Sequence, residues 1–342
     1  MSTTFRNYEN FEDYSVLMEL QPRQDNLLDM LGIFEEDYHQ GTLIELERIT
    51  AKTDKMYAVA RDADRQVSGR DDARSVAFKI PFFTLDAVVR PNELQDLRAI
   101  AVDPNQPATV QRSVDRVIAR IQRSHSDLHK RAMFNVLTAG TAYAVDAAGV
   151  AMPEYAVNFA TKWGVTRKVV TQDISDQAVD PSQYVEKEVR AYLNANIQDN
   201  STSLGVVGIV GSGYFNALTK HALVKEAYLN RDGGAGFLTE RLSGDAYRRT
   251  FTFDGVTYIE EPDVSVVARN KAYFIPMGVS MFRLDYAPAN TLEHANTVAE
   301  KAYLWVEEQR RKVVAESEVS VLASTTRPEL IVEITGTLPA WA

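Results

Sequence analysis

A charged stretch that runs directly into an apolar, β-prone stretch constrains this chain more than any other feature. Residues 61–74 read RDADRQVSGRDDAR, and residues 75–89 read SVAFKIPFFTLDAVV. Apolar side chains occupy every second position from residue 76 to residue 82, which predicts a strand with one buried face. Pro81 favours an edge strand or a bulge. The charged stretch cannot bury enough apolar surface to fold alone, so we expect a polar arm that lies on a neighbouring subunit.

Composition narrows the class of protein further. The chain has 342 residues, of which 45% are apolar, enough for a sizeable core and two domains. It has no cysteine, which excludes disulfides, thiolate zinc sites and cysteine nucleophiles and fits a reducing cytoplasm. The net charge of −10 argues against a general nucleic-acid binder. No apolar run approaches the ~18 residues of a membrane span, and the polar N-terminus lacks a signal-peptide core.

A long amphipathic helix is predicted after the arm and strand. Apolar residues recur every three or four positions from Val110 to Val136, with Thr109 as a candidate N-cap and Gly140 as the end of the helix. Arginines line another face of this helix at positions 112, 116 and 120. Like charges at this spacing repel, so they are expected either to meet acids on another element or chain or to form a solvated face.

The other predicted elements interleave helices and strands without strict βαβ alternation, which indicates an α+β fold. Residues 1–56 suit an extended N-terminal arm with a short helix near 27–31 and a strand at 41–48. Helices are expected at 182–197 and 214–228. Strands are expected at 168–171, 205–210, 247–259 with an Asp254-Gly255 turn, 272–282, and as two or three long strands within 302–337.

A glycine pattern offers one possible enzymatic site. Gly208, Gly211 and Gly213 follow a predicted strand and precede a predicted helix, as in a dinucleotide-binding fingerprint. Counting from Gly211, however, the third glycine of the fingerprint is replaced by Asn216, and no βαβ framework is evident. A plain strand–turn–helix is therefore favoured, and a nucleotide-dependent oxidoreductase stays as the alternative function.

Histidines and paired acids offer possible metal and acid–base sites. His125 and His129 could chelate a metal at their four-residue spacing, but we expect His125 to pack at a polar gap in the helix stripe and His129 to be exposed. The acid runs at 35–37 and 260–261 are expected to be solvated, because adjacent side chains point apart. No serine sits in a nucleophile elbow. No catalytic, metal or cofactor residue is assigned, and the chain is predicted not to be an enzyme.

The end of the chain carries a resemblance to a known family. Residues 319–323 (VSVLA) and 327–332 (RPELIV) look like the closing strands of tailed-phage major capsid proteins, which often carry an Arg-Pro-Glu-type turn there. Overall the chain resembles the lambda-type major capsid proteins (E family), which have the Hong Kong 97 capsid fold. The resemblance covers most of the chain as an order of elements. At the residue level it is specific near 68–91 and 314–336.

The resemblance implies a domain organisation. It places an N-terminal arm at 1–56, an extended β-hairpin loop (the E-loop) at 57–91, a peripheral domain with a long spine helix at 92–150 and 304–342, and an axial domain with a mixed sheet and flanking helices at 151–303. Some members of the fold form Lys–Asn crosslinks. Lys79 follows the polar arm, but the sequence gives no reason to expect a crosslink there.

The resemblance also implies a function and partners. The chain would be the structural major capsid protein of a tailed phage, assembling with itself into hexamers and pentamers of an icosahedral shell that encloses double-stranded DNA without binding it specifically. It would assemble in the host cytoplasm and reside in the virion capsid. A separate scaffolding protein, a portal and a decoration protein are the further expected partners, with no cofactor and no membrane. An encapsulin-like shell protein is a second alternative.

The residues expected to contact neighbouring subunits follow from the charge pattern for the arm and the long helix, and from the resemblance for the C-terminal turn. Acidic and basic residues alternate along the arm, so ion pairs with another subunit are expected in place of DNA contacts. The predicted contacts are Arg61, Asp62, Asp64, Arg65, Arg70, Asp71, Asp72, Arg74, Arg112, Arg116, Arg120, Arg327 and Glu329.

Overall fold

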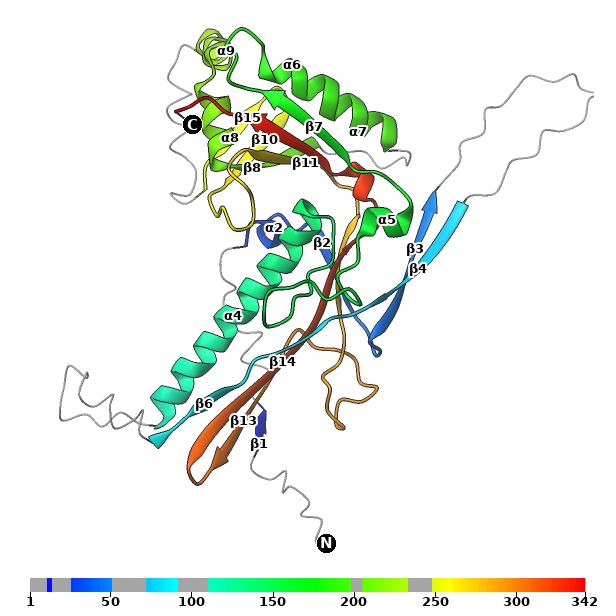
Figure 1. The fold of residues 1–342 in the computed structure, drawn as a ribbon, viewed down its shortest axis with the longest axis vertical. Coiled ribbons are helices and arrows are strands. Elements are labelled where there is room, and N and C mark those ends of the chain that lie inside the picture. Colours follow the sequence, from blue (N-terminus) through cyan, green and yellow to red (C-terminus); the bar gives the residue numbers. More distant parts are fainter. Residues whose placement is uncertain are drawn as a thin grey trace, which may run out of the picture.

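The computed structural model describes residues 11–13, 26–50, 72–91, 110–197, 205–232 and 248–341. Within these residues the predicted α+β class is confirmed by a six-stranded sheet, a seven-stranded sheet, a two-stranded hairpin and a long helix. Figure 1 shows the six-stranded sheet with its helices at one end and the long helix α4 (Val110–Thr138) running away from it beside the seven-stranded sheet. In the part of the chain described, none of the helices combines the length and apolarity that crossing a membrane needs.

The seven-stranded sheet is organised around β14 (Lys312–Thr325), which is buried from Val319 to its end. The other strands pair with it directly or through a neighbour: β1 (Phe11–Asp13), β2 (Phe34–Tyr38), β5 (Phe82–Thr84), β6 (Ala87–Val89), β12 (Phe282–Tyr286) and β13 (Tyr303–Gln309). The single strand expected over 75–89 is therefore split. Pro81 lies just before β5, where its missing N–H costs no ladder hydrogen bond.

The six-stranded sheet contains the strands β7 (Lys168–Asp173), β15 (Val332–Thr337), β11 (Lys271–Met277), β8 (Gly205–Gly211), β10 (Val256–Glu261) and β9 (Thr250–Phe253), in that spatial order. Its helices are α6 (Pro181–Val185), the π-helical turn η2 (Glu186–Arg190), α7 (Ala191–Asn196), α8 (Ser212–Lys220) and α9 (Ala222–Asp232). Asp254 and Gly255 have φ of 52° and 74°, which confirms the predicted hairpin turn between β9 and β10. The C-terminal β15 joins this sheet, although the expected boundaries put it with β13 and β14.

The long helix agrees with its sequence pattern. It begins at Val110 and ends at Thr138, and Gly140 follows with a φ of 67°, the left-handed conformation that stops a helix. Val114 and Ile121 of the predicted stripe are buried, whereas Val117 is half-buried and Ile118 is buried beside it. The candidate N-cap Thr109 lies outside the described residues.

Two predicted elements are each divided in the structure. The helix expected over 214–228 breaks between α8 and α9 at His221, which is fully buried, has an extended backbone and lies with its Nε2 3.1 Å from the carbonyl oxygen of Asp176. The strand run expected over 272–282 ends at Met277 as β11, and its last residue, Phe282, begins β12 in the other sheet. Gly278, with a φ of 80°, lies between them. The local apolar pattern predicts neither the end of α8 nor the end of β11, because both breaks depend on contacts with residues far away in the sequence.

Strand β2 was not predicted, since its sequence FEEDY has no period-two apolar pattern. It pairs in parallel with β12 at the edge of the sheet. Its acids are ion-paired: Glu36 with Lys301 at 2.6 Å, and Asp37 with Arg283. Just beyond the strand, His39 Nε2 lies 2.8 Å from the buried Asp285 Oδ1. Thus part of the acid run at 35–37 is a structural cluster, where a solvated one was expected.

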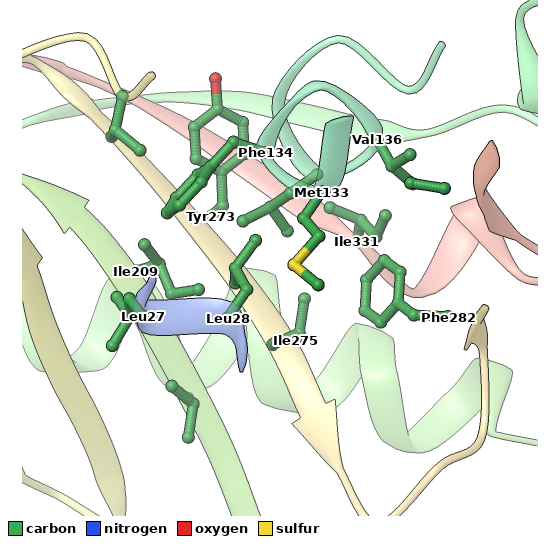
Figure 2. Packing of buried hydrophobic residues seen from close by; sticks show 14 of the residues in the cluster. Leu27, Leu28, Met133, Phe134, Val136, Ile209, Tyr273, Ile275, Phe282 and Ile331 are labelled. Atoms are coloured by element: carbon green, nitrogen blue, oxygen red, sulfur yellow. The ribbon is translucent and has the colours of Figure 1, made fainter. Parts of the chain in front are cut away.

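The main hydrophobic core lies where the C-terminal half of α4 meets both sheets. Figure 2 shows Met133 and Phe134 of α4 among Leu28, Ile275 and Phe282, which come from α2 (Leu27–Met30), β11 and β12. A second, smaller core lies under the N-terminal half of α4, against β6, β13 and β14. The helix therefore joins the two sheets along its length, which is what the name spine helix implies.

His125 lies on the buried side of this helix. Its side chain is 8% exposed, and Nε2 lies 2.9 Å from Ser317 Oγ on β14, which confirms the predicted polar gap in the stripe. His129 is half-buried, not exposed as expected, because its ring lies 5.9 Å from that of Tyr286. No group of residues suited to holding a metal exists in the described ranges. Burial, with a contribution from the charge of His129, lowers the pKa of His125 to about 4.

This lowered pKa predicts a pH-dependent stability. Above pH 6.5 His125 is neutral in both the folded and the unfolded chain, but between pH 6.5 and about 4 only the unfolded chain takes up the proton. We expect His125 to cost about 3 kcal/mol of unfolding free energy as the pH falls through this window. Urea unfolding across the pH range would measure it. His125→Gln should flatten this part of the slope, and an unchanged slope in this variant would contradict the prediction.

Candidate functional site: the projecting hairpin

The hairpin of β3 (Leu43–Thr50) and β4 (Asp72–Lys79) belongs to neither large sheet. Its two strands pair antiparallel along their whole length, and Figure 1 shows them projecting sideways from the body. The expected E-loop at 57–91 includes β4, but the expected boundaries place β3 in the N-terminal arm. Because the two strands pair, the projecting unit begins at Leu43.

The inner face of the hairpin is anchored on the body. Phe78 is 3% exposed, and its ring centroid lies 5.6 Å from that of Phe159 and 6.2 Å from that of Trp163, both on α5 (Phe159–Trp163). Ile44 and Leu46, on the same face, are buried too. This packing holds the base of the hairpin in one orientation.

Ion pairs and hydrogen bonds reinforce this anchor. Arg48, near the C-terminal end of β3, donates two hydrogen bonds to Glu329, at 2.7 and 3.2 Å. Arg327 approaches the same carboxylate at 3.5 Å and donates to the carbonyl oxygen of Asn196. Arg74 of β4 donates to the carbonyl oxygen of Trp163 at 2.8 Å. The turn between β14 and β15, with its short helix η3 (Pro328–Leu330), thus clamps the hairpin.

The outer face of the hairpin is exposed. The outward positions on β3 are Leu43, Glu45 and Glu47, opposite Lys79, Ala77 and Ser75 on β4. Lys79 Nζ reaches Glu154 and lies 4.9 Å from the ring centroid of Tyr155, and its hydrogen bond to Glu154 raises the pKa of the amine. Among the described residues, Glu45 and Glu47 have no cationic partner. The outer face therefore presents an apolar side chain and two free carboxylates.

The predicted contact residues divide into three groups. Arg61, Asp62, Asp64, Arg65, Arg70 and Asp71 lie outside the described residues, and the side chains of Asp72 and Arg112 are likewise not described. Arg74, Arg327 and Glu329 make the contacts within the subunit given above. Arg116 and Arg120 are exposed on α4, with no acid paired to either in the described part of the chain. Arg48 was missed, since nothing in the sequence connects it with Glu329, 281 positions away.

The acid pair Glu260–Glu261 is not solvated, which corrects the expectation. Glu260 is 4% exposed and binds Arg249 through two hydrogen bonds of 2.5 and 2.6 Å. Glu261 is 1% exposed and accepts two hydrogen bonds from Arg248 at 3.1 and 3.2 Å. The side chains point apart, as adjacent strand residues do, but each has its own arginine.

The glycine pattern serves packing. A Cβ atom at Gly213 would lie 2.6 Å from Leu338 Cδ1, and one at Gly211 would overlap the carbonyl oxygen of Ala268. The N–H of Tyr214, at the start of α8, donates to the carbonyl oxygen of Arg269. The residues around 268–270 therefore occupy the place that a phosphate would need. The geometry does not support the oxidoreductase alternative.

Comparison with solved structures defines the class of fold. The chain superposes on the capsid of Myoviridae phage XM1 with a TM-score of 0.51, 11% identity and coverage of 94% of this chain and 95% of that one. The cyanophage Pam1 capsid gives a TM-score of 0.53 at 12% identity, with 88% of each chain covered. The protein thus has the Hong Kong 97-like fold of phage capsids.

Sequence comparison identifies the family. The family model for phage major capsid protein E matches residues 16–336. The major capsid protein of Pseudomonas phage KPP10 is 28% identical over 358 aligned positions, which cover 96% of this chain and 97% of the relative. That of Salmonella phage Felix O1 is 21% identical, with 92% of each chain covered. The chain belongs to the phage major capsid protein E family, the major capsid proteins of tailed phages.

Proposed function

We propose that this protein builds an icosahedral shell of hexamers and pentamers around double-stranded DNA, with the β3–β4 hairpin as the strap between adjacent subunits. The single observation that carries the proposal is the hairpin itself. It is anchored on the body by Phe78 and Arg48 and exposes its outer face. A two-stranded hairpin is at best marginally stable alone, so the covering of this exposed face by a neighbour would stabilise it. Many such modest contacts then add up over a closed shell.

The proposal includes a division of the chain by sheet. The axial domain would hold the six-stranded sheet with its helices, and the peripheral domain would hold the seven-stranded sheet with α4. Compared with the boundaries expected from the resemblance, β3 moves from the arm to the extended loop and β15 to the axial domain. Strands β1 and β2 from the arm, β5 and β6 from the extended loop, and β12 from the axial domain move to the peripheral domain. The short connection from β14 to β15 then crosses between domains at the base of the hairpin, so hairpin position and domain orientation would be coupled.

The same proposal covers partners and location. A scaffolding protein supplied as a separate chain, a portal and a decoration protein complete the expected assembly, which would take place in the host cytoplasm. The protein would act as a structural subunit without catalytic activity. Of the predicted contact residues, the arm positions 61–72 and Arg112, Arg116 and Arg120 stay candidates for contacts outside the subunit. Arg74, Arg327 and Glu329 would act indirectly, by holding the hairpin.

Charge reversal on the outer face of the hairpin tests the strap. In the double variant Glu45→Lys/Glu47→Lys, we expect a folded subunit that forms few or no capsomers or shells, because two exposed carboxylates would no longer match a neighbour's cations. Size-exclusion chromatography and electron microscopy, with the scaffolding protein co-expressed, would measure assembly. The charge-preserving variant Glu45→Asp/Glu47→Asp is the control and should assemble. Normal assembly of the reversed variant would contradict the role of this face.

A further inference from the structure

Basic side chains gather at one end of the peripheral domain. Arg116, Arg120 and Arg123 are exposed on α4 at a spacing of four and three residues, so they share one helix face. This face lies opposite the buried Val114 and Ile118, which pack on the sheet. The helix therefore turns a row of three arginines to the outside.

Four more cations lie at the same end. The turn between β13 and β14 carries Arg310, Arg311 and Lys312, and all three are exposed. Arg90 is exposed just after β6, and the pairing of Val313 with Val89 brings it next to Lys312. Figure 1 shows the start of α4, the end of β6 and the β13–β14 turn together at the far end of the domain. We call these seven residues the basic end: Arg90, Arg116, Arg120, Arg123, Arg310, Arg311 and Lys312.

None of the seven forms an ion pair in the part of the chain that the structure describes, and two carboxylates, Asp115 and Glu308, are exposed among them. Elsewhere most described cations are engaged, as Arg48, Lys130 and Arg248 are. The chain as a whole carries a net charge of −10. A concentration of unpaired cations on an acidic protein indicates an external anionic partner.

The two faces of this domain differ in charge. Residues 313, 315 and 317 of β14 contact α4, so the alternate residues Glu316 and Glu318 point to the other face of the sheet. Glu307 of β13 lies there as well, since its neighbour Val306 packs under the helix. The three arginines of α4 lie on the helix side, whereas Arg90 and Lys312 lie at the end of the sheet on the face that also carries the acids. The helix side is therefore the more basic one, which is a reason for the domain to face a polyanion with the helix.

The composition of the basic end favours phosphate over protein as its partner. Large apolar side chains are not exposed along the described part of α4 or on β13 and β14. Interfaces between proteins depend on buried aromatic or aliphatic anchors, which this surface lacks. Contacts to a nucleic-acid backbone need only suitably placed cations, and arginine is well suited to phosphate oxygens.

We propose that the basic end binds the phosphate backbone of double-stranded DNA without sequence preference and therefore faces the interior of the shell. The inference rests on the proposed function, since it requires a shell that encloses DNA. Beyond the proposed function, the inference states which surface of the subunit contacts the DNA and how α4 is oriented relative to it. The binding would be weak for one subunit and strongly dependent on salt, because it is electrostatic.

The test uses unassembled full-length protein and a short fluorescent DNA duplex, with anisotropy measured over a salt series. In the triple variant Arg116→Gln/Arg120→Gln/Arg123→Gln, we expect at least a tenfold loss of affinity at low salt. The slope of log affinity against log salt should fall by about 2 to 3, since each lost phosphate contact contributes roughly 0.9. The control variant Lys162→Gln/Lys187→Gln/Lys225→Gln removes three exposed cations elsewhere and should stay within twofold of the wild type.

Several results would overturn the inference. Equal losses in both triple variants would mean that overall charge matters and that the basic end is not special. Unchanged DNA affinity combined with failed assembly would assign the arginines to a protein partner, either a second copy or an acidic scaffold. Electron microscopy of the wild-type preparation distinguishes failure of this inference from failure of the proposed function. Shells with normal DNA affinity in the arginine variant refute this inference alone, whereas absence of shells in the wild type refutes the proposed function.

Discussion

Replacing Glu261 with alanine is expected to destabilise the subunit by about 3–5 kcal/mol, because it leaves buried cations without their counter-charge. Glu261 is 1% exposed and accepts hydrogen bonds from Arg248, which is itself 5% exposed. Lys130 of α4 lies 3.6 Å from the same carboxylate and 2.8 Å from Asp263. Burial works against ionisation of Asp263, but hydrogen bonds from Lys130 and Ser265 prevail and lower its pKa to about 2. The cluster therefore ties the spine helix to the end of β10.

Urea unfolding would measure this effect. Glu226→Ala, at an exposed position on α9, is the control and should change the unfolding free energy by no more than about 0.5 kcal/mol. The double variant Glu261→Ala/Arg248→Met should recover a large part of the loss, since it removes the unpaired charge along with its partner. A loss below about 1 kcal/mol in the single variant would show that the remaining cations are hydrated and that the cluster does not stabilise the contact between α4 and β10.

Replacing Phe78 with alanine is expected to cost about 3–5 kcal/mol and to release the hairpin from the body. Phe78 is the buried side chain of β4 that packs against Phe159 and Trp163. Its loss leaves a cavity between the hairpin and α5, where the indole of Trp163 is held by a hydrogen bond to the carbonyl oxygen of Thr325. We expect faster proteolysis within the hairpin and weaker shell assembly.

The neighbouring Phe82 provides a matched control for this substitution. It lies on β5 and is 41% exposed, so Phe82→Ala should change stability by only about 0.5 kcal/mol. Differential scanning calorimetry and limited proteolysis would compare the two variants. If Phe78→Ala and Phe82→Ala behaved alike, the anchoring of the hairpin by Phe78 would be wrong, and the ion pair of Arg48 with Glu329 would have to supply it.

Much of the local structure could be predicted because its causes lie within a few residues. The stripe of α4, the Asp254-Gly255 turn and the alternation in β3 and β14 are all short-range patterns. The errors share a different cause. His221 breaks a helix and Glu260–Glu261 are buried because of Asp176, Arg248 and Arg249, and only the fold brings these partners together.

In the candidate site, too, the features with local causes could be predicted and those with long-range causes could not. From residues 61–89 alone, a projecting polar arm that ends in a half-buried strand could be expected, since that depends on composition and a period of two. The partner strand β3, the anchor under Phe78 and the clamp between Arg48 and Glu329 could not, because they join residues far apart in the chain. The sequence by itself determined the strand that follows the charged stretch and the long helix α4. Only the tertiary structure decided how the β3–β4 hairpin is held on the body, since long-range pairing and burial leave no local pattern.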